Sequence, residues 1–212
     1  MVIKLVQIFD KAVPLDFQKA CVRSIQQAYD EAYRRTVEDL CLEKEEGHDL
    51  LPYLRRTLIE RNLKNLARYY QGVHVSTRKN AARNCHHNVI HIGNLMMTIS
   101  SIDYPSRKVR QAKFRDNYIQ MTLFDFLRCQ NEEIFPIEGG LCYLIICHGE
   151  DIYSKGRLGF VKIVFPDTNG NYIPVIDLLS RFPEVITPAP ETEIISEDLP
   201  INVREQREKR EA

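Results

Sequence analysis

The sequence predicts an α+β fold in which N-terminal helices pack on a mostly antiparallel sheet of four to six strands. Apolar side chains recur at helical spacing over residues 14–70, and the pattern changes after Gln71-Gly72 to the short alternating or apolar runs typical of strands. A hydrophobic content of 44% fits a folded chain. We therefore expect one α+β domain over residues 1–187, with a helical layer at about 14–70 and a sheet-containing part at about 73–182.

The helical part begins after a short apolar stretch. Residues 1–9 lack the basic start and uninterrupted apolar run of a signal peptide, and we interpret them as a short strand. Pro14 and Asp16 suit the first turn of a helix over residues 14–40. An acidic loop at 43–47 follows, and Asp49 can cap a second helix over about 50–70.

The second part contains the strand signals. A strand is expected at 73–75, followed by a polar basic connection at 77–84. Gly93-Asn94 separates the runs 88–92 and 95–99 by a two-residue hairpin turn. Residues 141–147 are apolar throughout, which indicates a central strand that is buried on both faces. The remaining expected elements are a helix at about 107–127, strands at 158–165 and 172–176, and a short helix near 178–182.

Cysteine usage and hydropathy bear on the compartment. The chain has six cysteines but no CxxC pair, and without a secretory signal we expect reduced thiols and a cytoplasmic location. Cys142 and Cys147 are predicted to be buried thiols on opposite faces of one strand. No apolar run approaches the roughly 18 residues of a membrane span.

The formal charge is zero overall but is unevenly distributed. Between Tyr53 and Arg115 there are thirteen Lys and Arg residues against two acids, Glu60 and Asp103, so this basic block carries +11 and the rest of the chain −11. Such a separation favours an acidic or polyanionic partner. Several of these cations begin the helix expected at 107–127, where they oppose the helix dipole, so something other than local stability favours them.

These charges predict a non-enzymatic intracellular protein with a binding or regulatory role, which contacts nucleic acid or an acidic protein partner. Neutralisation of the basic block by acids of the same chain, at 38–49 or in the tail, is the alternative. No cofactor, metal or catalytic residue is assigned, and the oligomeric state stays open. The predicted contact surface consists of nine residues: Arg61, Lys64, Arg68, Arg78, Lys79, Arg83, Arg107, Lys108 and Arg110.

A histidine cluster suggests an enzyme alternative, a metal-dependent nuclease that uses His86, His87 and distant acids. Cys85, His87 and His91 would share one face of a strand, and both residue types are Zn²⁺ ligands. However, His87 and His91 would then lie roughly 13 Å apart along the strand, too far to hold one ion.

The order of elements after Asp49 is helix, three strands, helix and two strands, which resembles the restriction-endonuclease-like nuclease core. That resemblance implies an acid in the second strand and an acid-x-Lys motif in the third. The corresponding runs here, 87–92 and 95–101, contain neither an acid nor a lysine, and Mg²⁺ requires carboxylate oxygens. The missing motif argues against an active nuclease of this type and leaves an inactive binding relative open, and an order of elements alone supports no function.

The C-terminal residues 188–212 are predicted to form a mobile tail. They contain three prolines and few apolar side chains, so they bury too little surface to offset the entropy of ordering. We expect the tail acids Glu191, Glu193, Glu197 and Asp198 to fold back over the basic block and to compete with an anionic partner.

Overall fold

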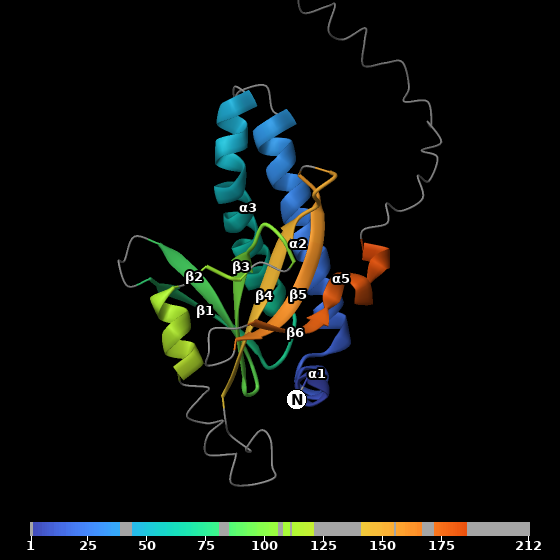
Figure 1. Ribbon diagram of the computed structural model, residues 1–212, viewed down its shortest axis with the longest axis vertical. Coiled ribbons are helices and arrows are strands. Elements are labelled where there is room, and N and C mark those ends of the chain that lie inside the picture. Colours follow the sequence, from blue (N-terminus) through green and yellow to red (C-terminus); the bar gives the residue numbers. More distant parts are fainter. Residues whose placement is uncertain are drawn as a thin grey trace, which may run out of the picture.

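The computed structural model describes residues 2–38, 44–80, 85–105, 108–110, 112–120, 141–154, 156–166 and 172–185 (Figure 1). Its helices are α1 (Val2–Ala12), α2 (Leu15–Tyr33), α3 (Lys44–Ala67) and α5 (Leu178–Arg181), with a π-helical segment (Arg34–Glu38) and a 3₁₀ segment (Pro183–Val185). Its strands are β1 (Val73–Lys79), β2 (His86–Ile92), β3 (Leu95–Ser101), β4 (Cys142–Glu150), β5 (Leu158–Pro166) and β6 (Tyr172–Asp177). A further helix covers residues 113–120.

The strands form one mixed sheet in sequence order, from β1 to β6. All neighbours pair antiparallel except β3 and β4, which are parallel. A parallel pair needs a long crossover, and the helix over 113–120 lies in that connection. The predicted fold class and the predicted order of helix, three strands, helix and two strands are confirmed for the described residues.

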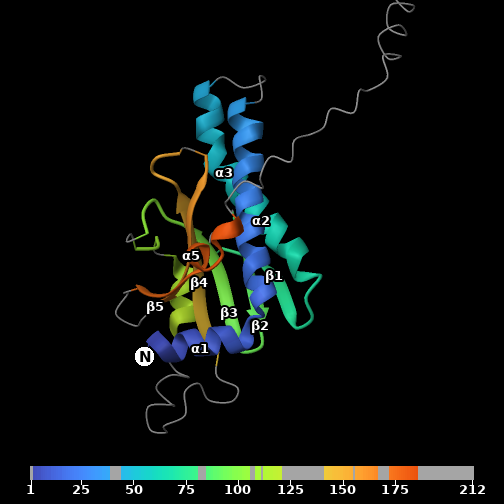
Figure 2. The ribbon, with the colours of Figure 1, turned by 90° about the vertical axis from the view of Figure 1, so that its right-hand side faces the viewer.

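Helices cover both faces of the sheet. α2 and α3 lie side by side on one face (Figures 1 and 2), where Ile25 and Ile59 join Ile90 and Leu144 in a large core. On the other face Tyr118, from the helix over 113–120, packs with strand residues in a smaller core. These two layers bury alternate residues of the central strands.

The central strand is confirmed. In β4 the side chains of Leu144, Ile145 and Ile146 are almost fully buried. Cys142 belongs to the larger core and Cys147 to the smaller one, so the two thiols occupy opposite faces as predicted. Burial raises the pKa of each thiol to about 12, so neither is a thiolate near neutral pH.

Three expectations for the N-terminal part were wrong. The strand expected at 1–9 is helix α1, whose Phe9 is buried in the core, because tertiary packing overrides the strand propensity of its β-branched residues. Of the acidic loop expected at 43–47, the described residues 44–47 belong to α3, whose first turn carries Glu45 and Glu46, where acids interact favourably with the helix dipole. Asp49 is therefore inside the helix. Gly47 permits the close approach of α3 to the preceding segment, because a Cβ there would collide with the carbonyl oxygen of Thr36.

The connections also differ from the expected ones. β1 extends to Lys79, so the polar connection begins later than residue 77. The helix expected from about 107 is non-helical at 108–110 and helical over 113–120. Residues 81–84, Arg107, the part of this helix beyond 120 and the tail at 188–212 lie outside the described residues. No described helix has the length and hydropathy needed to cross a membrane.

Candidate anion-binding site

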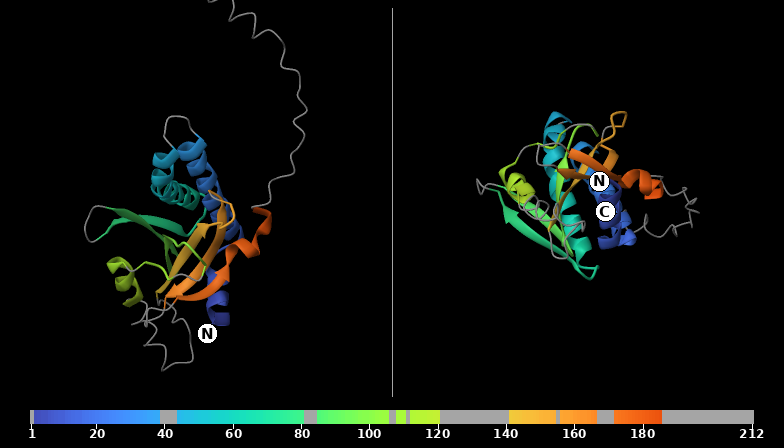
Figure 3. Two further views of the ribbon diagram at one scale, coloured as in Figure 1. Left: turned by 45° about the horizontal axis from the view of Figure 1, so that its top comes forward. Right: turned by 60° about the horizontal axis from the view of Figure 1, so that its bottom comes forward.

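The sheet divides between β2 and β3. β2 remains paired with β1 as far as His86, opposite Lys79, and β3 remains paired with β4 as far as Ser101, opposite His148. The ladder between β2 and β3 ends earlier, at Val89 and Thr98. The two halves of the sheet diverge beyond that point (Figure 1 and the left panel of Figure 3). We call this opening the fork.

A cavity of about 390 Å³ lies at the fork. Its walls come from α3, from β2, from the ends of β3 and β4, and from the segment that leads into the helix over 113–120. Four arginines and one glutamate face it, together with three histidines. The lining residues are Pro52, Arg55, Arg56, Ile59, Glu60, Asn80, Cys85, His86, His87, Ile99, Ser100, Ser101, Arg110, Ala112, Phe114, Arg115 and His148.

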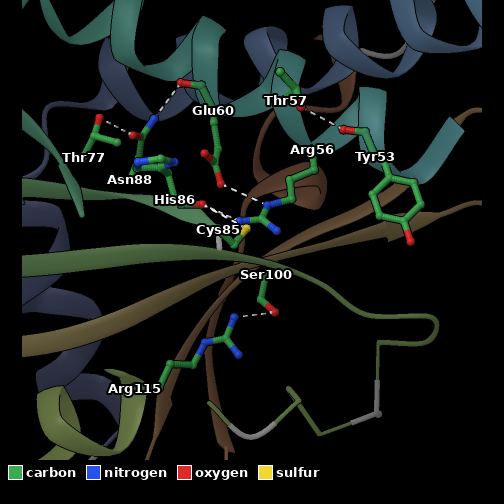
Figure 4. Close-up of polar contacts among 10 residues, drawn as sticks. All are labelled: Tyr53, Arg56, Thr57, Glu60, Thr77, Cys85, His86, Asn88, Ser100 and Arg115. Atoms are coloured by element: carbon green, nitrogen blue, oxygen red, sulfur yellow. Dashed lines mark hydrogen bonds and ion pairs between the residues drawn. The ribbon is translucent and has the colours of Figure 1, made fainter. Parts of the chain in front are cut away.

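Two of the arginines reach the fork from opposite faces of the sheet (Figure 4). Arg56, on α3, donates a hydrogen bond to the backbone carbonyl of His86 on β2 and pairs with Glu60 at 3.2 Å. Arg115 donates through Nη2 to Ser100 Oγ on β3, at 3.1 Å. Each half of the divided sheet therefore holds a guanidinium group.

Arg115 is the more unusual of the two, because it is buried without a carboxylate. The residue is 9% exposed, and its hydrogen-bond acceptors are the hydroxyl of Ser100 and the carbonyl of Arg110. Its Nε atom is buried without a hydrogen-bond partner, and it makes no ion pair within the described part of the chain. A buried charge that lacks a counter-charge is costly, so this position favours an anionic ligand.

Arg55 shows the contrasting arrangement. It is 7% exposed, but it pairs with Glu150 at 3.2 Å and stacks over the Tyr29 ring at 4.1 Å. The Tyr29 hydroxyl lies 2.9 Å from Nδ1 of His148. Burial, with a smaller effect of Arg55, lowers the pKa of His148 to about 3, so this histidine is neutral at physiological pH.

His87 completes the polar wall from β2. Its ring stacks on Phe114 at 3.9 Å, and both ring nitrogens are buried without a partner among the described residues. Burial lowers the pKa of His87, and the charges of Arg115, Arg56 and Arg78 lower it further. The neutral ring adds no positive charge at neutral pH.

The structure brings together only part of the predicted contact surface. Of the seven members that the structure describes, Arg110 alone lines the cavity. Arg78 and Lys79 of β1 lie next to the cavity, because they pair with its lining residues His87 and His86 of β2. Arg61 is exposed but is ion-paired with Glu31 of α2 at 2.8 Å, and Lys64 approaches Thr77 of β1 at 3.4 Å. Arg68 and Lys108 are exposed; Arg83 and Arg107 lie outside the described residues.

The histidine cluster does not form a metal site in the described part of the chain. His91 lies 3.2 Å from the hydroxyl of Ser76, and β2 is a strand, as the spacing argument required. Within the described residues no three His, Cys, Asp or Glu side chains are grouped so that they could hold a metal ion.

The sequence interpretation missed Arg55, Arg56, Arg115 and His148 as site residues. Arg115 had a signal, because cations in the first turn of a helix oppose its dipole. Arg55 and His148 had none, because their burial depends on partners that are distant in the sequence: Arg55 pairs with Glu150, and His148 contacts Tyr29.

Comparisons with known proteins assign no family, since no protein-family model, curated protein or solved structure matches the chain.

Proposed function

We propose that the protein is a non-enzymatic, intracellular nucleic-acid-binding protein whose contact surface is centred on the fork. The observation that carries this proposal is the buried guanidinium of Arg115. It lies beside the cavity, and among the described residues no carboxylate pairs with it. The planar donor geometry of arginine suits phosphate oxygens.

The surroundings of the cavity support a polyanion over a single anion. Exposed cations extend from the cavity along the end of β1 (Arg78 and Lys79) and along the chain before the helix over 113–120 (Lys108 and Arg110). Tyr53 follows Pro52, a lining residue, on α3 and is 73% exposed (Figure 4). An exposed tyrosine beside cations is a platform on which a base of a single strand can stack.

The free thiols among the described residues support an intracellular location. The described cysteines that are free are Cys21, Cys85, Cys142 and Cys147. Structural disulfides are typical of oxidising compartments, and free thiols are typical of reducing ones.

Binding of a fluorescent single-stranded oligonucleotide, followed by anisotropy over roughly 50 to 200 mM salt, tests the proposal. We expect log K to fall linearly with log salt concentration, by about 0.7 per phosphate contacted. The triple change Arg61→Glu, Lys64→Glu and Arg68→Glu should weaken binding and leave the melting temperature nearly unchanged. Arg23→Glu, a charge reversal at an exposed arginine of α2 outside the cavity, is the control for each reversal.

A second arm separates nucleic acid from an acidic protein partner. An acidic peptide of equal charge should compete poorly with the oligonucleotide, because it carries no bases to stack and no phosphates. Competition by the peptide at equal concentration, or an affinity that does not depend on salt, would contradict nucleic-acid binding.

A further inference from the structure

We infer that the fork cavity is a subsite for one phosphomonoester-bearing nucleotide, either at the end of a single strand or free in solution. The inference rests on the proposed function for the strand end, and it names the chemical group that the cavity accepts.

The first argument is size. A cavity of about 390 Å³ falls at the lower end of the range of small-ligand sites, roughly 300–1,000 Å³. It has room for one nucleotide and is far too small to admit a double helix. An internal segment of a strand could enter only by bending sharply, whereas a terminal nucleotide enters with its phosphate first.

The second argument is charge. Of the four arginines that line the cavity, Arg55 has Glu150 as its partner and Arg56 has Glu60. Arg110 and Arg115 form no ion pair with a described carboxylate. Among the described lining arginines and their carboxylate partners, four positive and two negative charges leave two positive charges. A phosphomonoester carries close to two negative charges near pH 7, whereas an internal phosphodiester carries one.

The third argument is the mixed chemistry of the walls. The guanidinium groups stand beside an apolar part of the lining formed by Pro52, Ile59, Ile99, Ala112 and the ring of Phe114. Sites for small ligands combine apolar surface with a few polar groups that fix orientation. The arginines suit the phosphate, and the apolar wall suits the sugar or base.

The fourth argument is the set of unpartnered polar atoms next to the cavity. Nε of Arg115, Nε of Arg55 and both ring nitrogens of His87 are buried without hydrogen-bond partners among the described residues. These three residues are 9%, 7% and 8% exposed, respectively. Buried polar groups in folded proteins are nearly always hydrogen-bonded, so this concentration at one cavity marks a site for a polar ligand.

The test compares single-stranded oligonucleotides of one sequence that carry a 5′-phosphate, a 3′-phosphate or hydroxyl groups at both ends. We expect one phosphorylated form to bind roughly ten to a hundred times more tightly than the hydroxyl form, the range expected for hydrogen bonds to a charged group. A nucleoside monophosphate should displace that form, and the matching nucleoside should not. Equal affinity of all three oligonucleotides, with no displacement by the monophosphate, would overturn the inference.

Variants locate the effect. Arg115→Gln should abolish the preference for the phosphorylated end, and Arg56→Gln, at a side chain that is 51% exposed and so tolerant of substitution, should reduce it. Arg61→Gln, on α3 like Arg56 but outside the cavity, should weaken the binding of all three oligonucleotides equally and leave the preference for the phosphorylated end intact. A preference that survives both Arg115→Gln and Arg56→Gln would place the subsite elsewhere and overturn the assignment.

The same measurements separate this inference from the proposed function. Salt-dependent binding of all oligonucleotides without an end preference would leave nucleic-acid binding standing and remove the phosphomonoester subsite. Binding of the monophosphate through Arg115, with no oligonucleotide bound, would keep the subsite for a free nucleotide and refute the proposed function.

Discussion

Two buried arginines at the fork show how similar side chains acquire different roles from their partners. Arg55 lies between the Tyr29 ring and the Glu150 carboxylate, which makes it part of the structural core. Arg115 has only neutral acceptors among the described residues. The sequence provided a reason to notice Arg115, whose charge opposes the dipole of its helix. It gave no reason to notice Arg55, which sits among other cations on a helix.

The buried pair of Tyr29 and His148 makes the stability of the fold sensitive to pH. The pKa of His148 is lowered to about 3 in the folded state, while an unfolded histidine titrates near 6.5. Below about pH 6.5 the His148 imidazole takes up a proton in the unfolded chain but not in the folded chain. Its contribution to stability is therefore fully present above about pH 6.5 and is lost as the pH falls. His148 alone contributes a slope of up to about 1.4 kcal/mol per pH unit.

Denaturant unfolding between pH 7 and pH 5 measures this effect. We expect the free energy of unfolding to decrease over that interval in the wild type and to decrease less in His148→Gln. Part of the slope should remain, because the pKa values of His87 and His91 are also lowered. Equal slopes in the wild type and the variant would contradict the assignment of His148 as a neutral buried residue.

At the scale of elements, hydrophobic periodicity predicted the strands well. The Gly93-Asn94 turn located the hairpin of β2 and β3, and the apolar run at 141–147 located the central strand, because both signals are local. The fork was not predictable in this way. Alternation shows which face of a strand is buried, but it does not show where two paired strands separate. In the fold β2 and β3 stop pairing at Val89 and Thr98, and beyond these residues β2 stays paired with β1 and β3 with β4.

The central position of β4 carries a stability prediction. Ile145 is fully buried in the smaller core, so Ile145→Ala should lower the free energy of unfolding by roughly 2–5 kcal/mol. Ile152 lies just beyond β4 and is 63% exposed, so Ile152→Ala should change it by less than about 0.5 kcal/mol. Denaturant titration of both variants measures the difference. Similar losses would show that β4 is not central to the core.

At the scale of the whole molecule, the neutral net charge conceals the separation between a basic block and an acidic remainder. The fold gathers four arginines of that block around one cavity and distributes others, such as Arg61 and Lys64, along α3. Composition alone predicted the block. It could not predict which of its members meet, because that depends on the approach of α3 and the helix over 113–120 to the fork from opposite faces.

The acidic tail provides a test at this scale. Truncation after Thr187 retains α5 and Phe182, which are part of the larger core, so the melting temperature should change little. If the tail acids compete with an anionic partner, the truncated chain should bind oligonucleotides more tightly, most visibly at low salt where surface charges are least screened. Unchanged affinity would remove this autoinhibitory role, and loss of folding would show that the tail docks as structure.

Hydrogen–deuterium exchange with and without a bound single-stranded oligonucleotide tests the central claim most directly, because it reports where the ligand contacts the protein. We predict slower exchange on binding at residues 86–88 of β2, at 99–101 of β3 and around Arg115, the segments that border the cavity. The middle of α2, on the far side of α3, should show no change. Protection confined to α2, or to the exposed face of α3 around Arg61 and Arg68, with none at the fork, would contradict the account.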